Sequence, residues 1–507
     1  MNEVCVFLPG EQIRLHHAGP LLHAANFMVF TKNRASITHS DFLRSSLDTT
    51  GRGVSSDEVI TWIRQRNGEI GVEVNPIPLA SMAKWKTEAD TGNLVHESGK
   101  FFSIEGVSVK TSMGEVKAWS QPIIHQPEVG ILGLLARKID GVYHFLIQAK
   151  IEPGNVNCVQ LSPTLQATRS NFTRAHQGKA PHFLDYFQNE AHRALVDLLQ
   201  SEQGARFFRK RNRNMIIEVN DSVPDHEDFR WLTLGQIKKL MEQPNLVNMD
   251  TRTVLSGVAY GSLSEQAANS LKVLAPFAMD GFGEAVFLSH VVDDQALHRH
   301  EEIMSWLVGL KATYDVQSNL IPLAQVEGWT RDEMRIRHEE GKYFEVIGVD
   351  VAITNREVSR WCQPLIKPVQ EGICALVAKK IDGALHFLLQ AKLEAGNLDI
   401  VELAPTVQCI TGNYRPGKNE YQVPYLDYVL QATPSQIRHD VLLSEEGGRF
   451  FHSQNRYMVI EAGANFPDQL PDNYCWMTLN QIMRFMYFNN FLNIEVRSLI
   501  SMLSLTS

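Results

Sequence analysis

The chain repeats itself at a spacing of about 242 residues, and this duplication constrains its fold more than any other feature of the sequence. Residues 119–122 (Trp-Ser-Gln-Pro) recur as residues 361–364 (Trp-Cys-Gln-Pro), which gives the spacing (361 − 119 = 242). Residues 148–150 (Gln-Ala-Lys) recur as residues 390–392 at the same offset. This spacing is far longer than the ~20–50 residues of solenoid units. Two homologous globular domains are therefore predicted, and each copy serves as an alignment for the other.

The repeat divides the 507 residues into four parts. Residues 1–57 are predicted to form an N-terminal extension, and residues 58–248 the first repeat, which opens with a helix around Trp62. Residues 249–300 are a predicted linker with a helix, and residues 301–507 form the second repeat with a C-terminal tail. Its opening helix is expected around Trp306.

Composition narrows the class of protein. Hydrophobic residues make up 44% and charged residues 21% of the chain, as in ordinary globular proteins. The net charge of −9, without a basic tail, argues against nucleic acid or a membrane surface as the main partner. The six cysteines are scattered and the N-terminus lacks the pattern of a secretion signal, so a cytoplasmic location is expected.

Local patterns predict mixed α and β structure in each repeat. Two apolar runs flank Asp140-Gly141, a dipeptide typical of two-residue hairpin turns, and the same arrangement recurs at Asp382-Gly383. Residues 190–201 and their twin 435–444 are predicted helices, each followed by an extended segment. A further helix is expected after Thr233 and after Thr478, while residues 281–283 are predicted to form a loop. The expected fold class is α+β with a mainly antiparallel sheet.

A row of polar residues on the second hairpin strand is the first candidate site. His144, Gln148, Lys150 and Glu152 share one face of the predicted strand, because side chains alternate with a period of two. The second copy has the same types at the same places: His386, Gln390, Lys392 and Glu394. Such a row is either the solvated face of an amphipathic strand or the lining of a polar pocket. An imidazole, an amide, an ammonium and a carboxylate can bind a polyol and transfer protons.

The loop after this strand is a weaker candidate. It contributes polar residues that a sugar nucleotide can contact: Asn155, Thr164, Gln166, Thr168 and Asn171. In the second copy Gln408 matches Gln166, but Ile410 replaces Thr168. The first copy therefore carries more hydrogen-bonding groups, although a turn rich in small polar residues accounts for the same pattern.

A basic segment and an aromatic residue complete the candidate set. On an extended strand Arg209, Arg211 and Arg213 would share a face and converge on one anion, whereas a basic strand can also be a solvated sheet edge. Trp119 could stack a base, which makes a nucleotide diphosphate the natural anion to expect. The second copy retains fewer cations, and its matching residues are Trp361, Gln363, Arg449, Asn455 and Arg456.

Several common motifs are missing. The sequence has no glycine-rich dinucleotide fingerprint, no phosphate-binding P-loop and no zinc-protease or serine-hydrolase motif. The repeated His96-Glu97 pair is expected to be a turn into a strand, and no metal site is predicted.

Together these residues resemble the NDP-hexose 2,3-dehydratase family of bacterial deoxysugar biosynthesis. The matching motifs include residues 119–122, 148–155 (Gln-Ala-Lys-Ile-Glu-Pro-Gly-Asn), 161–168 (Leu-Ser-Pro-Thr-Leu-Gln-Ala-Thr), 209–213 (Arg-Lys-Arg-Asn-Arg) and 402–408 (Glu-Leu-Ala-Pro-Thr-Val-Gln). The resemblance implies two Nudix-like domains per chain, a homodimer, and a dTDP-linked 4-keto-6-deoxyhexose substrate handled without metal or redox cofactor. The Nudix signature is missing from both copies, so the resemblance argues against metal-dependent diphosphate hydrolysis.

The resemblance also suggests roles for the candidate residues. Glu152 or His144 would transfer protons, Lys150 would stabilise an enolate oxygen, and Gln148 would orient a hydroxyl. The diphosphate would lie on Arg209, Asn212 and Arg213, with Trp119 and Gln121 near the base. The first copy is the expected catalytic copy, and the second holds an auxiliary sugar-nucleotide site or a structural vestige.

Two other functions fit parts of the sequence. A non-catalytic sugar-nucleotide binding protein would bind dTDP and leave the ketosugar unchanged. A Nudix-type hydrolase would require a metal ion and release a nucleoside monophosphate.

Overall fold

The computed structural model describes residues 5–8, 11–14, 32–168, 181–220, 223–262, 281–354, 358–409, 423–463 and 465–506. Residue composition also predicts helices for residues 15–30 and 262–272, and apart from Ser262 these segments lie outside the described ranges. In the described part of the chain, no helix combines the length and apolar composition needed to cross a membrane.

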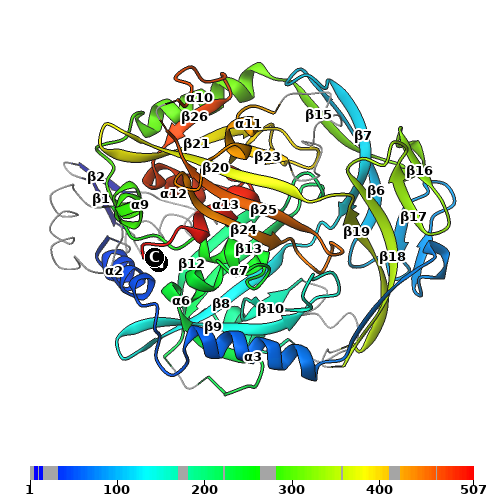
Figure 1. Cartoon of the computed structure of the whole chain (residues 1–507), viewed down its shortest axis with the longest axis horizontal. Coiled ribbons are helices and arrows are strands. Elements are labelled where there is room, and N and C mark those ends of the chain that lie inside the picture. The colour runs from blue at the N-terminus through cyan, green and yellow to red at the C-terminus, as the bar shows by residue number, and fades with distance from the viewer. Residues whose placement is uncertain are drawn as a thin grey trace.

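Each repeat contains one large seven-stranded sheet (Figure 1). In the first repeat its strands are β8 (Gly130–Ile139), β9 (Val142–Ile151), β10 (Val159–Ser162), β11 (Leu165–Ala167), β12 (Arg193–Ser201), β13 (Arg211–Glu218) and β14 (Phe229–Thr233). In the second repeat they are β20 (Gly372–Ile381), β21 (Ala384–Lys392), β22 (Glu402–Pro405), β23 (Val407–Cys409), β24 (Ile437–Ser444), β25 (Gln454–Glu461) and β26 (Tyr474–Met477). One pair in each sheet, β8–β13 and β20–β25, is parallel, and the remaining pairs are antiparallel.

Helices cover these sheets in matching positions. Those of the first half are α2 (Lys32–Leu47), α3 (Ser56–Glu69), α5 (Leu184–Gln188), α6 (Leu234–Leu240) and α7 (Met249–Leu255). Those of the second half are α9 (Gly281–Val291), α10 (His300–Thr313), α11 (Leu426–Leu430), α12 (Leu479–Met486) and α13 (Ile494–Met502). The expected α+β class with a mainly antiparallel sheet is confirmed.

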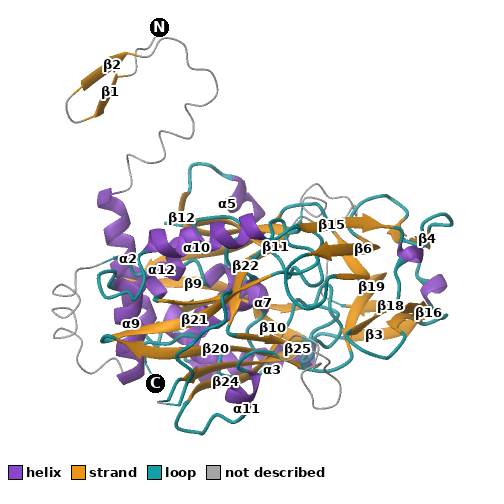
Figure 2. Cartoon of the chain, turned by 90° about the horizontal axis from the view of Figure 1, so that it is seen from above, coloured by secondary structure: helices purple, strands orange, loops and turns teal. Residues whose placement is uncertain are grey.

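Two smaller five-stranded sheets lie together at one end of the molecule (Figure 2). One contains β4 (Trp85–Thr87), β5 (Leu94–His96), β6 (Ser103–Thr111), β7 (Ala118–His125) and β15 (Val316–Ile321). The other contains β16 (Trp329–Arg331), β17 (Arg335–His338), β18 (Phe344–Ile353), β19 (Arg360–Pro368) and β3 (Val72–Ile77). The short 3₁₀ helices η1 (Leu79–Ser81) and η2 (Leu323–Gln325) and the hairpin β1 (Cys5–Leu8)–β2 (Glu11–Arg14) complete the elements.

The repeats exchange strands in the small sheets. Strand β3 belongs to the first repeat but pairs with β18 of the second, with Val72 opposite Ile353. Strand β15 belongs to the second repeat and pairs with β6 of the first, with Val316 opposite Thr111. Backbone hydrogen bonds therefore bind each half to the other, so the halves are interlocked rather than linked side by side.

At the centre of the molecule, a buried arginine of each repeat donates hydrogen bonds to the other repeat. Arg252 on α7 donates to the carbonyl of Ser444 at 2.8 Å, and Arg497 on α13 donates to the carbonyl of Ser201. Both side chains are almost fully buried, so hydrogen bonds must satisfy their charges. Helices α7 and α13 thus hold the end of one large sheet against the other.

The predicted hairpin and helix caps are confirmed. Asp140 and Gly141 both have positive φ, 49° and 79°, as a tight turn between β8 and β9 requires. Thr233 caps α6 by accepting from the backbone N–H of Gln236 at 3.2 Å, and Thr478 caps α12 in the same way. The opening helices at Trp62 and Trp306 are α3 and α10.

Three local predictions were wrong. Residues 193–201 form β12 instead of a helix, and residues 437–444 form β24. Burial alternates along β12, with Val196, Leu198 and Gln200 inside, because pairing with β13 outweighs the helix propensity of its leucines. The predicted loop at residues 281–283 is the first turn of α9.

Helix α9 has a counterpart in α2, which precedes the first repeat. Ser45 on α2 donates to the carbonyl of Tyr143 and accepts from the N–H of Leu234. Ser289 on α9 makes the matching bonds to Leu385 and Leu479. The duplicated architecture therefore includes one helix on the N-terminal side of each expected repeat boundary.

Candidate functional site

Side chains from both repeats surround a pocket of about 310 Å³. Its floor is formed by β8, β9 and β11 of the first large sheet. Its wall is formed by strand β19 and by residues 446–449 after β24, all of the second repeat. Backbone hydrogen bonds of Gly154 with Gly447 and His452 hold these second-repeat residues beside the first repeat's sheet.

Three of the four residues in the predicted polar row line this pocket. Gln148 and Lys150 extend from β9, and Glu152 follows directly after it. The Lys150 ammonium donates to Gln166 Oε1 at 2.6 Å and lies 3.7 Å from a Glu152 carboxylate oxygen. Gln166 Nε2 donates to the same Glu152 oxygen at 3.1 Å. The row is therefore a connected amine, amide and carboxylate on a rigid sheet.

Asp250, at the first turn of α7, extends this network. Gln166 Nε2 also donates to the Asp250 carboxylate, so one amide joins two acids. Burial raises the pKa of Asp250, and the nearby charges of Glu446, Glu202 and Glu152 raise it further. The pocket can thus hold a proton among its carboxyl groups as well as on its lysines.

The second repeat supplies a cation and an indole. Arg449 donates from Nε to Gln126 Oε1 at 3.2 Å, and its guanidinium lies 4.2 Å from the Phe102 ring centroid. Trp361 donates to Gln363 Oε1 at 2.8 Å, and Gln363 in turn donates to the carbonyl of Gly448 at 2.8 Å. Sequence reasoning had grouped these residues with the second copy's own site, whereas the structure brings them to the first copy's pocket.

Lys210 lines the pocket, and its charge and that of Glu202 influence each other's ionisation. Burial lowers the pKa of Lys210 to about 8, and Glu202 and Glu446 oppose that shift. Burial and Glu446 raise the pKa of Glu202 to about 8, while Lys210 lowers it. Lys210 lines the pocket and also donates to the carbonyl of Glu128.

Aromatic residues from β4, β5 and the following loop form another part of the lining. Trp85 packs against Phe102 at 4.9 Å and edge-on against His96 at 5.5 Å between ring centroids. Phe101 packs edge-on against His96 at 4.8 Å. An aromatic wall beside a polar row is suited to a ligand with a flat base and a hydrophilic sugar.

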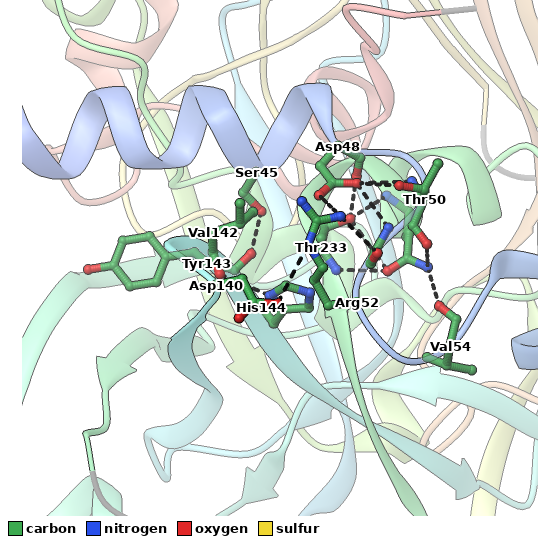
Figure 3. A network of polar contacts seen from close by, with 12 residues as sticks. Ser45, Asp48, Thr50, Arg52, Val54, Asp140, Val142, Tyr143, His144 and Thr233 are labelled. Atoms are coloured by element: carbon green, nitrogen blue, oxygen red, sulfur yellow. Dashed lines mark hydrogen bonds and ion pairs between the residues drawn. The ribbon is translucent and has the colours of Figure 1, made fainter.

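His144 does not lie on the pocket. It is fully buried, and its Nδ1 contacts the carbonyl of Val142 at 2.9 Å. Burial lowers its pKa, which favours the neutral ring. Figure 3 shows His144 beneath the loop after α2, near Arg52 and the Asp48–Thr50 turn. The imidazole sits in the contact between α2 and the sheet, away from Lys150 and Glu152.

Other predicted residues are also placed apart from the pocket. Trp119 and Gln121 belong with the second copy, where Trp119 packs near Leu393 and Ala395 and Gln121 donates to the carbonyl of Ala205. Asn155 is buried and donates to the carbonyl of Cys158 at 2.9 Å. Asn171 lies outside the described residues.

The predicted arginine cluster does not form. Arg209 has a positive φ of 51°, which interrupts the extended chain before β13 begins at Arg211. Its guanidinium donates to the carbonyl of Ser318, whereas Arg213 forms an exposed bidentate pair with Asp197. Of the basic segment, Lys210 and Asn212 line the pocket. Side chains alternate between faces only on a continuous strand. The bend at Arg209 breaks this alternation, and Lys210 faces the pocket in place of the arginines.

Thr164, Gln166 and Thr168 do line the pocket. Thr164 accepts from the N–H of Leu135 at 3.0 Å and donates to the carbonyl of Leu146, so it ties β8 to β9 beneath the polar row. Thr406 makes the same two bonds in the second sheet.

The second copy's row is bonded largely to the protein itself. Gln390 donates to the carbonyl of Pro405 at 2.8 Å, and Gln408 donates to Glu394 at 2.8 Å. His386 is fully buried, like His144, and contacts the carbonyl of Ala384. Lys392 is half-buried, and the pKa of Glu394 is raised by burial while Lys392 and Arg206 oppose that shift. The amides here bind the protein's own groups.

Asn455 and Arg456 serve the second sheet. Asn455 accepts from the N–H of Gly372 and donates to Glu445, and Arg456 pairs with Asp440 as Arg213 pairs with Asp197. Three charged residues of the pocket were not predicted from the sequence: Lys210, Asp250 and Glu446. The comparison of the two copies could have indicated two of them, because Lys210 corresponds to Ser453 and Glu446 corresponds to Gln203.

Within the described ranges, no group of three or more histidine, cysteine or acidic side chains is arranged to hold a metal ion. Among the side chains that the structure describes, five cysteines are free thiols: Cys158, Cys362, Cys374, Cys409 and Cys475.

The fold and the pocket define an internally duplicated α+β protein with an acid–base site shared between its two halves. A sequence profile described as NDP-hexose 2,3-dehydratase matches residues 56–258 and 300–503, one match per repeat. The chain belongs to the NDP-hexose 2,3-dehydratase family.

Three named relatives are similar to this chain along most of their length. A dTDP-4-dehydro-6-deoxy-α-D-glucopyranose 2,3-dehydratase from Saccharopolyspora spinosa is 46% identical over 465 residues, covering 91% of this chain and 94% of the relative. Proteins of the same name from Amycolatopsis orientalis and Streptomyces violaceoruber are each 42% identical, covering 90% and 87% of this chain and 92% and 95% of the relatives.

Proposed function

We propose that the protein is a dTDP-4-keto-6-deoxyhexose 2,3-dehydratase of deoxysugar biosynthesis, a hydro-lyase. The observation that carries this proposal is the connected row of Lys150, Gln166 and Glu152 in a pocket, in a chain whose relatives bear that activity in their names. The reaction needs proton transfer at carbon and oxygen and stabilisation of one oxyanion. Those are the tasks that this row of residue types can perform.

The first step is removal of the C3 proton. The neighbouring C4 ketone acidifies this proton, and its loss gives an enolate with the charge on the C4 oxygen. Glu152 is the proposed base, and the Lys150 ammonium is the proposed partner of the enolate oxygen. Gln166 holds both groups in place through its two hydrogen bonds to them.

The second step expels the C2 hydroxyl. The enolate electron pair re-forms the C4 ketone and creates a C2–C3 double bond, while the C2–O bond breaks and the oxygen takes up a proton to leave as water. The resulting C3 enol loses its O–H proton and gains one at C2, which gives a 3,4-diketo-2,6-dideoxy sugar. No electrons leave the sugar in this sequence. Gln148 is placed on the same strand to orient a sugar hydroxyl.

The pocket suggests a direction for the substrate. The aromatic wall of Trp85, Phe102 and Trp361 is the proposed place of the thymine base, and the row on β9 is the proposed place of the sugar. Arg449 lies between these two regions, since its guanidinium stacks on Phe102 and the charge of Glu152 acts on it. We assign the diphosphate to Arg449 in place of Arg209 and Arg213.

Four further features belong to the proposal. Each large sheet, with one parallel pair and flanking helices, is proposed to be Nudix-like, the chain is proposed to be a homodimer, and its location is proposed to be the cytoplasm. The second copy's row is proposed to be an auxiliary sugar-nucleotide site or a structural vestige.

The test is incubation of the purified protein with dTDP-4-keto-6-deoxyglucose without added metal, followed by mass spectrometry. The expected result is loss of one water and trapping of the product by a diamine as a 3,4-diketone. Unchanged ketosugar with dTDP still bound would support a binding protein instead. Release of a nucleoside monophosphate only with metal would support a hydrolase.

A further inference from the structure

The pocket differs from its counterpart in the second copy by two charges. Glu446 lines the pocket, and the matching residue opposite the second row is Gln203. Lys210 lines the pocket, and its match is Ser453. The row itself, Gln148, Lys150 and Glu152, is identical in both copies. An acid and an amine have therefore been retained or acquired together at one of two otherwise similar sites.

Backbone contacts between the repeats fix Glu446 at the pocket. The adjacent Gly447 accepts at its carbonyl from the N–H of Gly154 at 2.8 Å, and His452 donates to the carbonyl of Gly154 at 2.7 Å. A Cβ at Gly154 would stand 1.6 Å from the carbonyl oxygen of Phe450, so the two backbone segments are in direct contact here. Because Glu152 precedes Gly154 by two residues, this contact places the Glu446 carboxyl beside the polar row.

Lys210 is held in the same region from the other side. Its backbone carbonyl accepts from the N–H of Glu202 at 2.9 Å, and its ammonium donates to the carbonyl of Glu128. It is only 5% exposed, so its charge acts on neighbouring carboxyls with little screening by water. This charge lowers the pKa of both Glu446 and Glu202.

The carboxyl groups of this region oppose one another's ionisation. Burial raises the pKa of Glu446, and the charge of Glu152 raises it further, while Arg449, Lys210 and Lys150 lower it. Like charges that share a buried site retain a proton between them. Glu446 is thus a candidate proton donor, and Lys210 is a cation ready to stabilise the carboxylate that remains after donation.

We propose that Glu446, from the second repeat, is the acid that protonates the departing C2 hydroxyl, and that Lys210 stabilises the carboxylate left behind. This inference rests on the proposed dehydratase function and separates its two steps between two sets of groups. Lys150 and Glu152 act at C3 and the C4 oxygen. As the C2–O bond breaks, its electron pair goes to oxygen, the Glu446 proton completes a water molecule, and the enolate pair forms the C2–C3 double bond.

The test measures the two steps separately in the full-length protein. Glu446→Gln copies the residue found at the second site, and the reaction is run with dTDP-4-keto-6-deoxyglucose in deuterated water. Mass spectrometry of recovered substrate reports deuterium at C3, and product formation reports loss of water. We expect dehydration to fall by about 10²–10⁴-fold while C3 exchange continues. Glu446→Asp should recover part of the dehydration, and the exposed-residue control Glu301→Gln should match the unmodified protein.

Lys210→Met provides the second measurement. It should lower the dehydration rate less than Glu446→Gln does and leave C3 exchange in place, because its role is to stabilise a charge and not to donate the proton. Thermal unfolding of each variant establishes that it is folded.

Two results would overturn the inference. One is dehydration that persists at the original rate in Glu446→Gln. The other is equal loss of exchange and dehydration in a folded Glu446→Gln, which would place the residue in the C3 step or in binding. If the unmodified protein itself shows neither exchange nor dehydration, the proposed function fails as well, and that outcome is distinguishable from the first two.

Discussion

The two polar rows of this chain contain the same residues, but their surroundings differ. On β9, Lys150 and Glu152 line a 310 Å³ pocket with a second acid and a second amine nearby. In the second copy, Gln203 and Ser453 occupy the sequence positions that correspond to Glu446 and Lys210, and the Gln390 amide donates to the carbonyl of Pro405. The comparison shows that an identical row is not sufficient for equal chemistry. The neighbours that cross from the other repeat decide what the row can do.

The largest expected effect separates the two lysines. Lys150→Ala should lower dehydration by about 10³-fold or more, because it removes the partner of the enolate oxygen, whereas Lys392→Ala should change it by only a few-fold. Turnover of both variants under the same conditions measures this. The reverse order would assign the reaction to the second copy.

The next effect compares the central arginines, where the two halves are alike. Arg252→Met and Arg497→Met should each lower the free energy of unfolding by about 3 kcal/mol or more, since each leaves buried carbonyls without a donor. Denaturant unfolding of the two variants gives the comparison. A large difference between them would show that the halves contribute unequally to stability.

A smaller effect concerns binding. Arg449→Met should raise KM by about 10–100-fold with a smaller change in kcat, as expected for loss of one charge-assisted hydrogen bond to the diphosphate. Steady-state kinetics with the sugar nucleotide measures both constants. Arg213→Met, which breaks only an exposed pair with Asp197, is the control and should leave KM unchanged. Equal effects of the two variants would indicate that the diphosphate binds to the basic segment 209–213 instead.

The smallest effect concerns the buried Lys238, which corresponds to Met483 in the second copy. Lys238 is fully buried and donates to the carbonyls of Ser501 and Leu503, and burial lowers its pKa to about 7. The unfolded chain then binds more protons than the folded one between about pH 7 and the ordinary lysine pKa of 10.5, so stability should rise with pH in that window. Lys238→Met should remove the part of this rise that Lys238 causes, on the order of 1 kcal/mol per pH unit. The part caused by Lys210, whose pKa burial lowers to about 8, should remain.

Unfolding measured from pH 7 to 10 checks this prediction. Nearby His290 has a pKa lowered to about 3 by burial, so its own effect on stability belongs to lower pH and does not overlap. A slope that persists unchanged in Lys238→Met would assign the pH dependence to other groups.

Local signals predicted the parts of the fold that depend on neighbouring residues. The Asp140-Gly141 turn and the Thr233 cap were correct, because each rests on backbone conformation and hydrogen bonds within a few residues. Strand β12 was mistaken for a helix, because its identity comes from pairing with β13 and not from its own leucines. The exchange of β3 and β15 has no local signal at all, and neither has the placement of Trp361 at the first copy's pocket.

The candidate site was predicted in part for the same reason. Gln148, Lys150 and Glu152 were found because a strand period and a repeated pattern both indicate them. Lys210 was overlooked because Arg209 bends the chain, and Glu446 because it comes from the other repeat. His144 fits the same period but meets α2 instead of the pocket, and the sequence of β9 alone does not reveal what covers each end of the strand.

The exchanged strands also bear on how one gene came to encode an asymmetric protein. Because each row is completed by residues of the other half, a single ancestral unit would have had neighbours to complete its row only when paired with an identical partner. In such a pair every substitution appears at both rows. Fusion of the two coding sequences removes that constraint, and an acid and an amine can then diverge at one row while the other drifts. The interlocked strands keep the two halves of the fold alike. The covalent link allows the side chains at the two rows to differ.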